Sequence, residues 1–306
     1  MENKTNIIIA GVNKAGTTSL FTYLGEHPEI CPSSIKETCY FLPLRYGNAI
    51  EPISTYNKYF KNCSDKKFLL ESTPGYFYGG TNLSQKIKET LPNTKLIFSL
   101  RNPVERLISF YRFKKNHLEL PAEMTFSEYI NKCKSYSKED FKDQTLNPYF
   151  GLEGGKYVDY IKDWESFNPD DILFIDFGGI TSDPSLGLID ICNWLKLDSN
   201  FYSTYEYDTH NKSVAVKNRS LQKVALSANK KLEKIFRENK KLKQKLKTIY
   251  YKMNGKKMQE QIDENLIKEL DKFYEPYSVE LLKYFNDKKR TDAPKWVLGS
   301  PSVPIS

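Results

Sequence analysis

The sequence predicts an α/β fold with a P-loop-like three-layer core, in which a central parallel β-sheet is flanked by helices. Four short apolar runs have the length and the polar or turn boundaries of buried parallel strands: residues 6–12, 67–70, 95–100 and 171–177. Helical patterns lie between and beside these runs. This alternation of strand and helix is typical of a doubly wound sheet with right-handed crossovers.

The helical patterns carry recognisable start and stop signals. One pattern follows the first strand directly, the second is closed by Pro92, and the third begins with Pro103 at a helix N-terminus. Two more flank the fourth strand. In order, the five patterns span residues 17–26, 84–91, 103–117, 156–167 and 184–197. Because ligands of such sheets bind at the carboxyl ends of the strands, we expect the functional residues there.

A long basic segment stands out in the second half of the chain. Residues 220–253 contain no Gly or Pro, and apolar residues recur in steps of four and three, which predicts one amphipathic helix about 50 Å long. Residues 217–257 hold 15 Lys/Arg and two acids, a net charge of +13. The rest of the chain therefore sums to −5 against the total of +8.

This segment has three interpretations. In the first, the helix packs on its own domain and its lysines lie in solvent. In the second, residues 220–253 pair two copies of the chain as a homodimeric coiled coil. In the third, the helix contacts an anionic membrane or a polyanion. Gly255 is expected to end the helix. A last helix over 262–285 is expected to break near Pro276.

Length and composition indicate a globular protein. With 306 residues, 39% of them hydrophobic, we assign 1–290 to a single domain, 217–257 to a helical insertion within it, and 291–306 to an irregular tail that Trp296 could anchor. No apolar run approaches the roughly 20 residues of a membrane span, and no signal peptide precedes the first strand. We expect a cytoplasmic protein without a nucleic-acid partner, of a composition that fits a bacterial source.

The cysteines and histidines predict neither disulfides nor metal sites. The cysteine count is odd and no CxxC pair occurs, which argues against a disulfide framework or a zinc site and fits a reducing compartment. The histidines are far apart, without an HExxH spacing. These residues are Cys31, Cys39, Cys63, Cys133, Cys192, His27, His117 and His210.

The first strand leads into a loop with the features of an anion site. Gly11 and Gly16 let the backbone approach a ligand, and the free amides at the following helix start attract negative charge. Lys14 adds a positive charge, two residues before Gly16 rather than after it as in a Walker A motif. An ordinary strand–helix turn is the alternative. The binding candidates are Asn13, Lys14, Ala15, Gly16, Thr17, Thr18 and Ser19.

A second motif follows the third strand. Arg101 comes at the carboxyl end of this strand, Pro103 starts a helix, and Ser109 lies about two turns along it. An arginine fork and a hydroxyl so placed could hold a second phosphate, although Arg101 could instead pair with Glu105. Two separated anion sites at one sheet edge suggest a ligand with two phosphate centres.

Together these motifs resemble the sulfotransferases that use 3′-phosphoadenosine-5′-phosphosulfate (PAPS), above all bacterial members and the heparan-type catalytic domain. The loop Lys14–Thr18 is similar to the family's 5′-phosphosulfate loop, and Leu100–Tyr111 to its 3′-phosphate motif. Further similar segments follow in family order over about residues 6–286, among them 36–41, 71–76, 155–157, 217–219 and 273–276.

The resemblance implies a metal-free, in-line transfer of a sulfuryl group that leaves adenosine 3′,5′-bisphosphate (PAP). Lys14 would neutralise charge on the leaving phosphate, which the loop amides, Thr17 and Thr18 would hold. Arg101 and Ser109 would hold the 3′-phosphate, and Arg219, with Lys217, would close over the nucleotide. Glu37 aligns with the family's base and would take the acceptor's proton; His117 is the runner-up.

Departures from the heparan-type pattern fall on the acceptor side. Cys39 and Leu42 stand where those enzymes have a His and an Asp, and Ser72 replaces a lysine. We therefore expect a small molecule, such as a secondary metabolite, or a saccharide as acceptor, neutral or cationic rather than polyanionic. Lys36 and Tyr76 complete the acceptor-side candidates.

Two other functions compete with this interpretation. A P-loop nucleotide kinase or NTPase needs a Walker lysine and a magnesium-binding Asp at a strand end, but the third strand ends in Arg101. A non-catalytic protein could bind polyanions or membranes through the basic segment.

Overall fold

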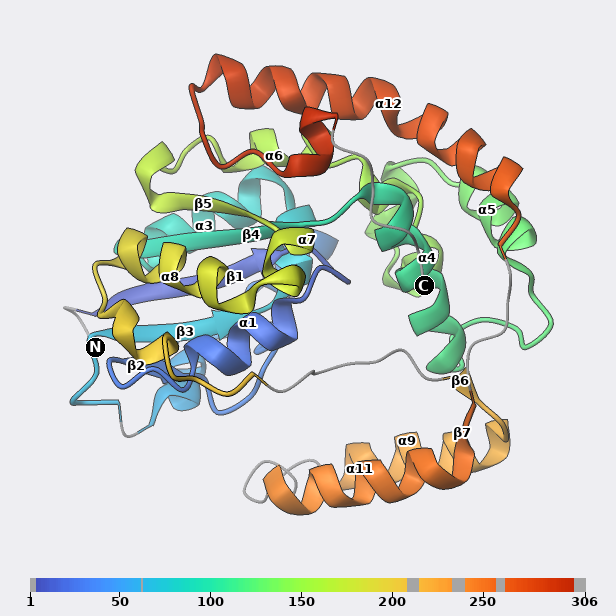
Figure 1. The fold of residues 1–306 in the computed structure, drawn as a ribbon, viewed down its shortest axis with the longest axis horizontal. Coiled ribbons are helices and arrows are strands. Elements are labelled where there is room, and N and C mark those ends of the chain that lie inside the picture. The colour runs from blue at the N-terminus through green and yellow to red at the C-terminus, as the bar shows by residue number, and fades with distance from the viewer. Residues whose placement is uncertain (1–3, 62, 208–214, 233–239, 257–261, 300–306) are drawn as a thin grey trace.

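The computed structural model describes residues 4–61, 63–207, 215–232, 240–256 and 262–299. Its centre is a five-stranded parallel sheet in the order β2-β3-β1-β4-β5 (Figure 1). The strands are β1 (Thr5–Gly11), β2 (Ile30–Pro32), β3 (Phe68–Ser72), β4 (Thr94–Leu100) and β5 (Ile172–Asp176). The predicted α/β class is therefore confirmed. The three-residue edge strand β2 was not predicted.

Alternating residues of β1 point to opposite faces of the sheet, and each face is covered by helices. Ile8 packs with α3 (Gly80–Thr90) and α12 (Glu264–Asp287). Ile7 and Ile9 pack with α1 (Thr17–Leu24) and α8 (Pro184–Leu195) on the other face. This is the three-layer arrangement that the alternating pattern predicts. β1 lies between β3 and β4, so the carboxyl ends of these three strands meet at one edge.

The remaining helices surround this core. α4 (Pro103–Asn116) starts after β4 and has Asn102 as its N-cap, which accepts hydrogen bonds from the amides of Val104 and Glu105. α4 packs with α5 (Phe126–Lys134) and the first half of α12 in a separate apolar cluster. The predicted helix over 156–167 is only one turn of α-helix, followed by a 3₁₀ turn. The other short helices are α2 (Ile53–Asn57), α5 (Phe126–Lys134), α6 (Val158–Ile161) and α7 (Phe177–Ser182).

The prediction of one long helix over 220–253 is wrong. The structure has two helices, α9 (Arg219–Lys231) and α11 (Lys240–Asn254), and two short strands, β6 (Ala215–Val216) and β7 (Gly255–Lys256), that pair antiparallel. The amide of Lys217 donates to the carbonyl of Asn254 at 2.8 Å. A straight helix would hold these ends about 50 Å apart. We call residues 215–256 the basic hairpin; its residues 233–239 lie outside the described part.

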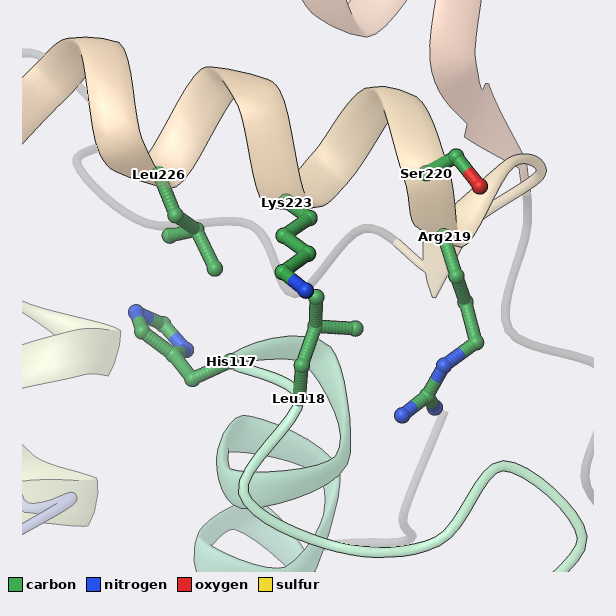
Figure 2. A pocket seen from close by; sticks show the side chains of 6 residues that line it. All are labelled: His117, Leu118, Arg219, Ser220, Lys223 and Leu226. Carbon is green, nitrogen blue, oxygen red and sulfur yellow. The ribbon is translucent and has the colours of Figure 1, made fainter.

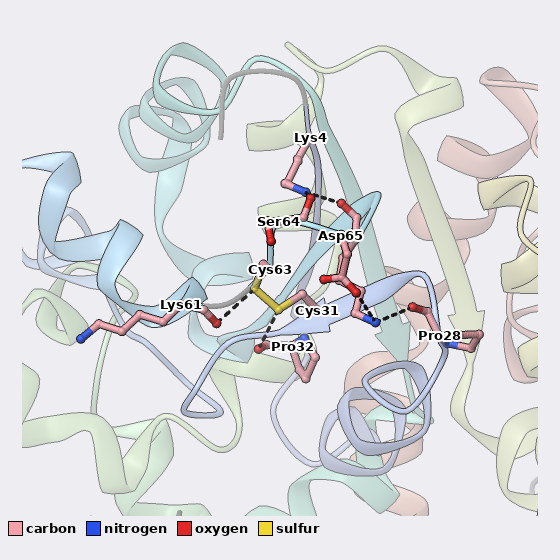
Figure 3. Close-up of a disulfide and its surroundings, with 9 residues drawn as sticks. Lys4, Pro28, Cys31, Pro32, Lys61, Cys63, Ser64 and Asp65 are labelled. Atoms are coloured by element: carbon pink, nitrogen blue, oxygen red, sulfur yellow. Dashed lines mark hydrogen bonds and ion pairs between the residues drawn. A yellow bond between two sulfur atoms is a disulfide. The ribbon is translucent and has the colours of Figure 1, made fainter.

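The expectation against disulfides is also wrong, because Cys31 and Cys63 are joined in one (Figure 3). Cys31 lies in β2, and Cys63 precedes β3, which pairs with β2. The pairing brings their Cα atoms to 5.7 Å. The undetected edge strand therefore hid this proximity from sequence reasoning. Cys39, Cys133 and Cys192 are free thiols.

The predicted break of the last helix at Pro276 is wrong. α12 continues through Pro276, and Tyr274, Leu281 and Phe285 are buried along it. Within the predicted tail, residues 295–298 form a 3₁₀ turn, and the Trp296 ring lies 6.0 Å from that of Tyr157; residues 300–306 lie outside the described part. No helix of the described residues is long and apolar enough to cross a bilayer.

Candidate active site

The loop between β1 and α1 has the geometry of an anion cradle. Gly16 has a φ of 73°, and a Cβ there would lie 2.8 Å from the Phe177 ring, so glycine is required twice over. α1 begins at Thr17 without a side-chain cap. Its first amides are therefore not satisfied by a capping side chain, unlike those of α4. The Ser99 hydroxyl donates to the carbonyl of Ala15 at 2.6 Å and fixes the loop to β4.

Lys14 projects from this loop into a crowded cationic environment. Its ammonium lies 4.2 Å from the centre of the Phe113 ring on α4. Burial, together with the charges of Arg101 and Lys36, lowers the pKa of Lys14 to about 8, whereas Glu37 acts against them. These influences place both predicted motifs and the Glu37 segment within electrostatic range of one lysine.

Arg101 joins the second motif to the phosphate loop. Its Nη1 donates to the carbonyl of Lys14 at 3.4 Å, and its guanidinium lies 4.6 Å from the centre of the Phe177 ring. Its Nε donates to Glu105 at 3.1 Å, so the local pairing that the sequence left open is present. Ser109 is half-buried one turn before Phe113, on the same face of α4.

On the opposite side of Lys14, residues 36–42 form a strained turn. Glu37 and Cys39 have φ values of 63° and 55°, which are unusual for residues with side chains. The amide of Glu37 donates to the carbonyl of Ser72 at 2.8 Å, which holds the turn on the end of β3. The Glu37 carboxylate is half-exposed and accepts from the Lys36 ammonium at 2.6 Å. It is therefore accessible but ion-paired.

A buried carboxylate supports this turn. Glu71, at the end of β3, is fully buried and accepts hydrogen bonds from the hydroxyls of Thr38, Thr73 and Tyr76. Tyr76 in turn accepts from the amide of Phe41 at 3.1 Å. Burial raises the pKa of Glu71, and the hydroxyl donors oppose that rise. Glu71 was not among our site candidates, although a charged residue ending an apolar strand is a sequence signal for one.

The other acceptor-side candidates are less exposed than expected. Ser72 and Tyr76 are fully buried beneath the turn rather than open to a ligand. Leu42 begins a 3₁₀ turn, and a Cβ at Gly75 would lie 3.1 Å from its Cδ1. Burial raises the pKa of the Cys39 thiol to about 11, so it is protonated at neutral pH.

His117 lines a cavity of about 460 Å³ between the end of α4 and α9 of the basic hairpin (Figure 2). Arg219, Ser220, Lys223 and Leu226 line it from α9, and Leu118 lines it from the segment that follows α4. The His117 ring lies 3.9 Å from that of Phe113, which also contacts Lys14. Burial lowers the pKa of His117, which favours the neutral imidazole.

The predicted pair Lys217 and Arg219 lies at the N-terminal end of α9. Arg219 donates to the carbonyl of Leu120 at 3.0 Å beside this cavity. Lys217 is exposed at the base of the basic hairpin and does not line the cavity. No group of three or more His, Cys, Asp or Glu side chains in the described residues could hold a metal ion.

A parallel sheet with an uncapped helix and a glycine loop at its central strand defines the class of P-loop-like, phosphate-binding α/β proteins. Within this class the family can be stated. The model of the sulfotransferase domain matches residues 4–287, and the chain belongs to that family.

Relatives and solved structures agree with this assignment. The membrane-associated sulfotransferase kil1 of Dictyostelium discoideum is 36% identical over 130 residues, which are 41% of this chain and 27% of that protein. The bifunctional heparan sulfate N-deacetylase/N-sulfotransferase 1 of Caenorhabditis briggsae is 26% identical over 67% of this chain and 23% of its own length. This chain thus spans about a quarter of these curated relatives.

Among solved structures, a sulfotransferase from Alicyclobacillus acidocaldarius superposes with a TM-score of 0.57 at 20% identity. The match covers 76% of this chain and 94% of that one. It supports the shared fold.

Proposed function

We propose that this protein transfers a sulfuryl group from PAPS to a hydroxyl or amine of a small-molecule or saccharide acceptor. The observation that carries this proposal is the convergence of three segments on Lys14. Arg101 bonds to the backbone of Lys14, and both Lys36 and Glu37 act on its pKa. A phosphate cradle, a second anion-binding arginine and a carboxylate thus surround one lysine.

The residues present fit the donor. The uncapped start of α1, with Thr17 and Thr18, suits the 5′-phosphate, and Arg101 with Ser109 suits the 3′-phosphate. PAPS supplies the sulfuryl group and leaves as PAP. Arg101 would exchange its contact with Glu105 for the phosphate, because a bidentate arginine–phosphate pair is stronger than the single Nε contact to the Glu105 carboxylate.

Lys14 would stabilise negative charge as it develops on the leaving phosphate oxygen. Burial first, and the neighbouring cations second, lower the pKa of Lys14 and disfavour the charged ammonium in the ligand-free protein. A bound anion reverses this effect, so donor binding would restore a full positive charge next to the bond that breaks.

Glu37 is the proposed base, and His117 remains the alternative. Glu37 lies on the β3 side of Lys14 and can accept a proton directly once Lys36 releases it. His117 lies on the α4 side, behind Phe113, and its lowered pKa keeps it neutral and able to accept a proton. The two groups approach Lys14 from different sides, so they imply different entry routes for the acceptor.

The acceptor is proposed only as a class. The cavity beside His117 is large enough for one sugar ring or a similar body. Arg219 and Lys223 line it, so a cationic acceptor would find no acidic partner among its lining residues. A cationic acceptor would therefore have to enter from the Glu37 side.

Binding of PAP without magnesium tests the proposal. We expect PAP to raise the melting temperature in the presence of EDTA, since the cradle binds both phosphates without a metal. If Mg-ATP raises the melting temperature and PAP does not, the result would favour the nucleotide-kinase alternative and contradict the proposal. Labelled PAPS incubated with the protein and an extract of the native organism would then identify the acceptor from its labelled product.

A further inference from the structure

The basic hairpin carries most of the exposed large hydrophobic residues of the described part of the chain. Ten such side chains are exposed in the described residues, and six of them belong to the basic hairpin: Leu221, Val224, Leu232, Leu246, Ile249 and Met253. The other four are scattered over the remaining chain. Scattered apolar residues are normal on a protein surface, but a concentration on one protruding element marks a contact surface (Figure 1).

These side chains form one stripe on each helix. Leu221 and Val224 are three residues apart, as are Leu246 and Ile249, and Met253 follows four residues later. These spacings place them on a single face of each helix. Gln222 and Leu226, by contrast, point at α4: the Gln222 amide donates to the carbonyl of Asn116, and Leu226 lines the cavity in Figure 2. The apolar stripe of α9 therefore lies on a different face from the one that contacts the domain.

Lysines accompany the stripes. Lys231, Lys245 and Lys252 are exposed, and none has an ion-pair partner among the described residues. Lys245 and Lys252 are seven residues apart and border Ile249 on one side of α11. Their long apolar stems allow the ammonium groups to reach past a buried stripe to the headgroup level.

We propose that the basic hairpin is a membrane-binding element that lies in the surface of a bilayer containing anionic lipids. Its apolar stripes would enter the acyl boundary while its lysines contact the headgroups. The net charge of +13 over residues 217–257 selects an anionic surface and opposes pairing with a second identical hairpin. A soluble polyanion would satisfy the lysines but leave the apolar stripes in water. This inference does not depend on the proposed sulfuryl transfer.

Vesicle co-sedimentation of the full chain tests the proposal. We expect binding to phosphatidylcholine vesicles that contain phosphatidylserine, weak binding to phosphatidylcholine alone, and partial release by salt. The variant Val224→Gln/Ile249→Gln should bind the anionic vesicles at least about tenfold more weakly. The matched control is Val279→Gln/Leu186→Gln. Val279 and Leu186 are 63% and 61% exposed outside the basic hairpin, against 64% and 47% for Val224 and Ile249.

Three results would overturn the proposal. One is the absence of binding to anionic vesicles by a wild-type protein that unfolds cooperatively. Another is equal loss of binding in the hairpin variant and in its control. The third is a dimer in sedimentation equilibrium that Val224→Gln dissociates, because the stripe would then serve a second copy. Thermal unfolding of each variant checks that it is folded.

Discussion

The two sides of Lys14 are built by different means. On the phosphate-loop side, residues 11–19 and Arg101 follow directly from β1 and β4, and the loop has two left-handed residues, Lys14 and Gly16. On the Glu37 side, the turn 36–42 holds two residues with side chains at positive φ, and the buried Glu71 supports it from below. Each segment of the first side therefore follows its own central strand directly, whereas the turn of the second side is held by side chains from several other segments.

This difference predicts separable failures. Changes on the phosphate-loop side should affect donor binding and charge stabilisation, whereas changes on the Glu37 side should affect proton transfer and stability but leave the donor bound.

Lys14→Ala should cause the largest loss. Removing the cation next to the leaving oxygen should reduce the transfer rate by about 10³-fold or more, in line with the loss of one preorganised charge-stabilising group. Single-turnover transfer of labelled sulfate from PAPS measures it. The exposed Lys162→Ala is the control, because its ammonium pairs only at the surface with Glu280. Near-normal turnover of Lys14→Ala would refute the assigned role.

The disulfide should contribute the next largest effect. Cys31 and Cys63 are separated by 32 residues, so Cys31→Ser/Cys63→Ser should lower the free energy of unfolding by about 2–4 kcal/mol. Urea unfolding of oxidised wild type and of the variant gives this difference. Since the phosphate-loop side lies outside the closed loop, the Kd for PAP should stay the same. A large loss of PAP affinity would show that the two sides are not separable.

Glu37→Gln should remove the proton acceptor of the reaction but leave the binding site for the donor intact. We expect a loss of about 10²-fold in kcat with an unchanged Kd for PAP, because glutamine keeps the shape of the side chain but cannot take the proton. His117→Ala is the parallel variant. If His117→Ala loses the activity and Glu37→Gln retains it, the base belongs to the α4 side and the assignment reverses.

The pH dependence of kcat/KM should show the smallest effect, which comes from the charge of Lys14 alone. In the ligand-free protein the pKa of Lys14 is about 8, lowered from 10.5, so its charge is lost as the pH rises through that value. The kcat/KM for PAPS should therefore fall about tenfold per pH unit well above pH 8. Lys14→Arg keeps its charge and should lack this alkaline fall. A wild-type profile that stays flat to pH 10 would contradict the pKa and its cause.

The phosphate-loop side could be predicted from the sequence because its residues follow single strands. Periodicity located β1 and β4, and their next residues were then the candidates. Glu71 was not predicted as a site residue because its role depends on three hydroxyls that only the folded chain assembles around it. The edge strand β2 was not predicted because three residues, one of them Pro32, give no periodic signal.

The basic hairpin shows a different limit. Steps of four and three residues are the same in one long helix and in two shorter ones, so the pattern predicted the apolar faces but not where the chain reverses. The residues that reveal the reversal are Asn254 and Lys217, whose backbones bond across 37 positions of the chain. A contact between residues so far apart cannot be predicted from the local spacing of apolar residues.

The disulfide has a topological consequence for the Glu37 side. Lys36, Glu37, Cys39 and Leu42 all lie between Cys31 and Cys63, so the turn belongs to a covalently closed ring of the chain. A single peptide-bond cleavage within this ring opens it but leaves both products joined through the sulfurs. A protease nick beside the proposed base would thus appear on a gel only after reduction, whereas a nick elsewhere would release a fragment directly.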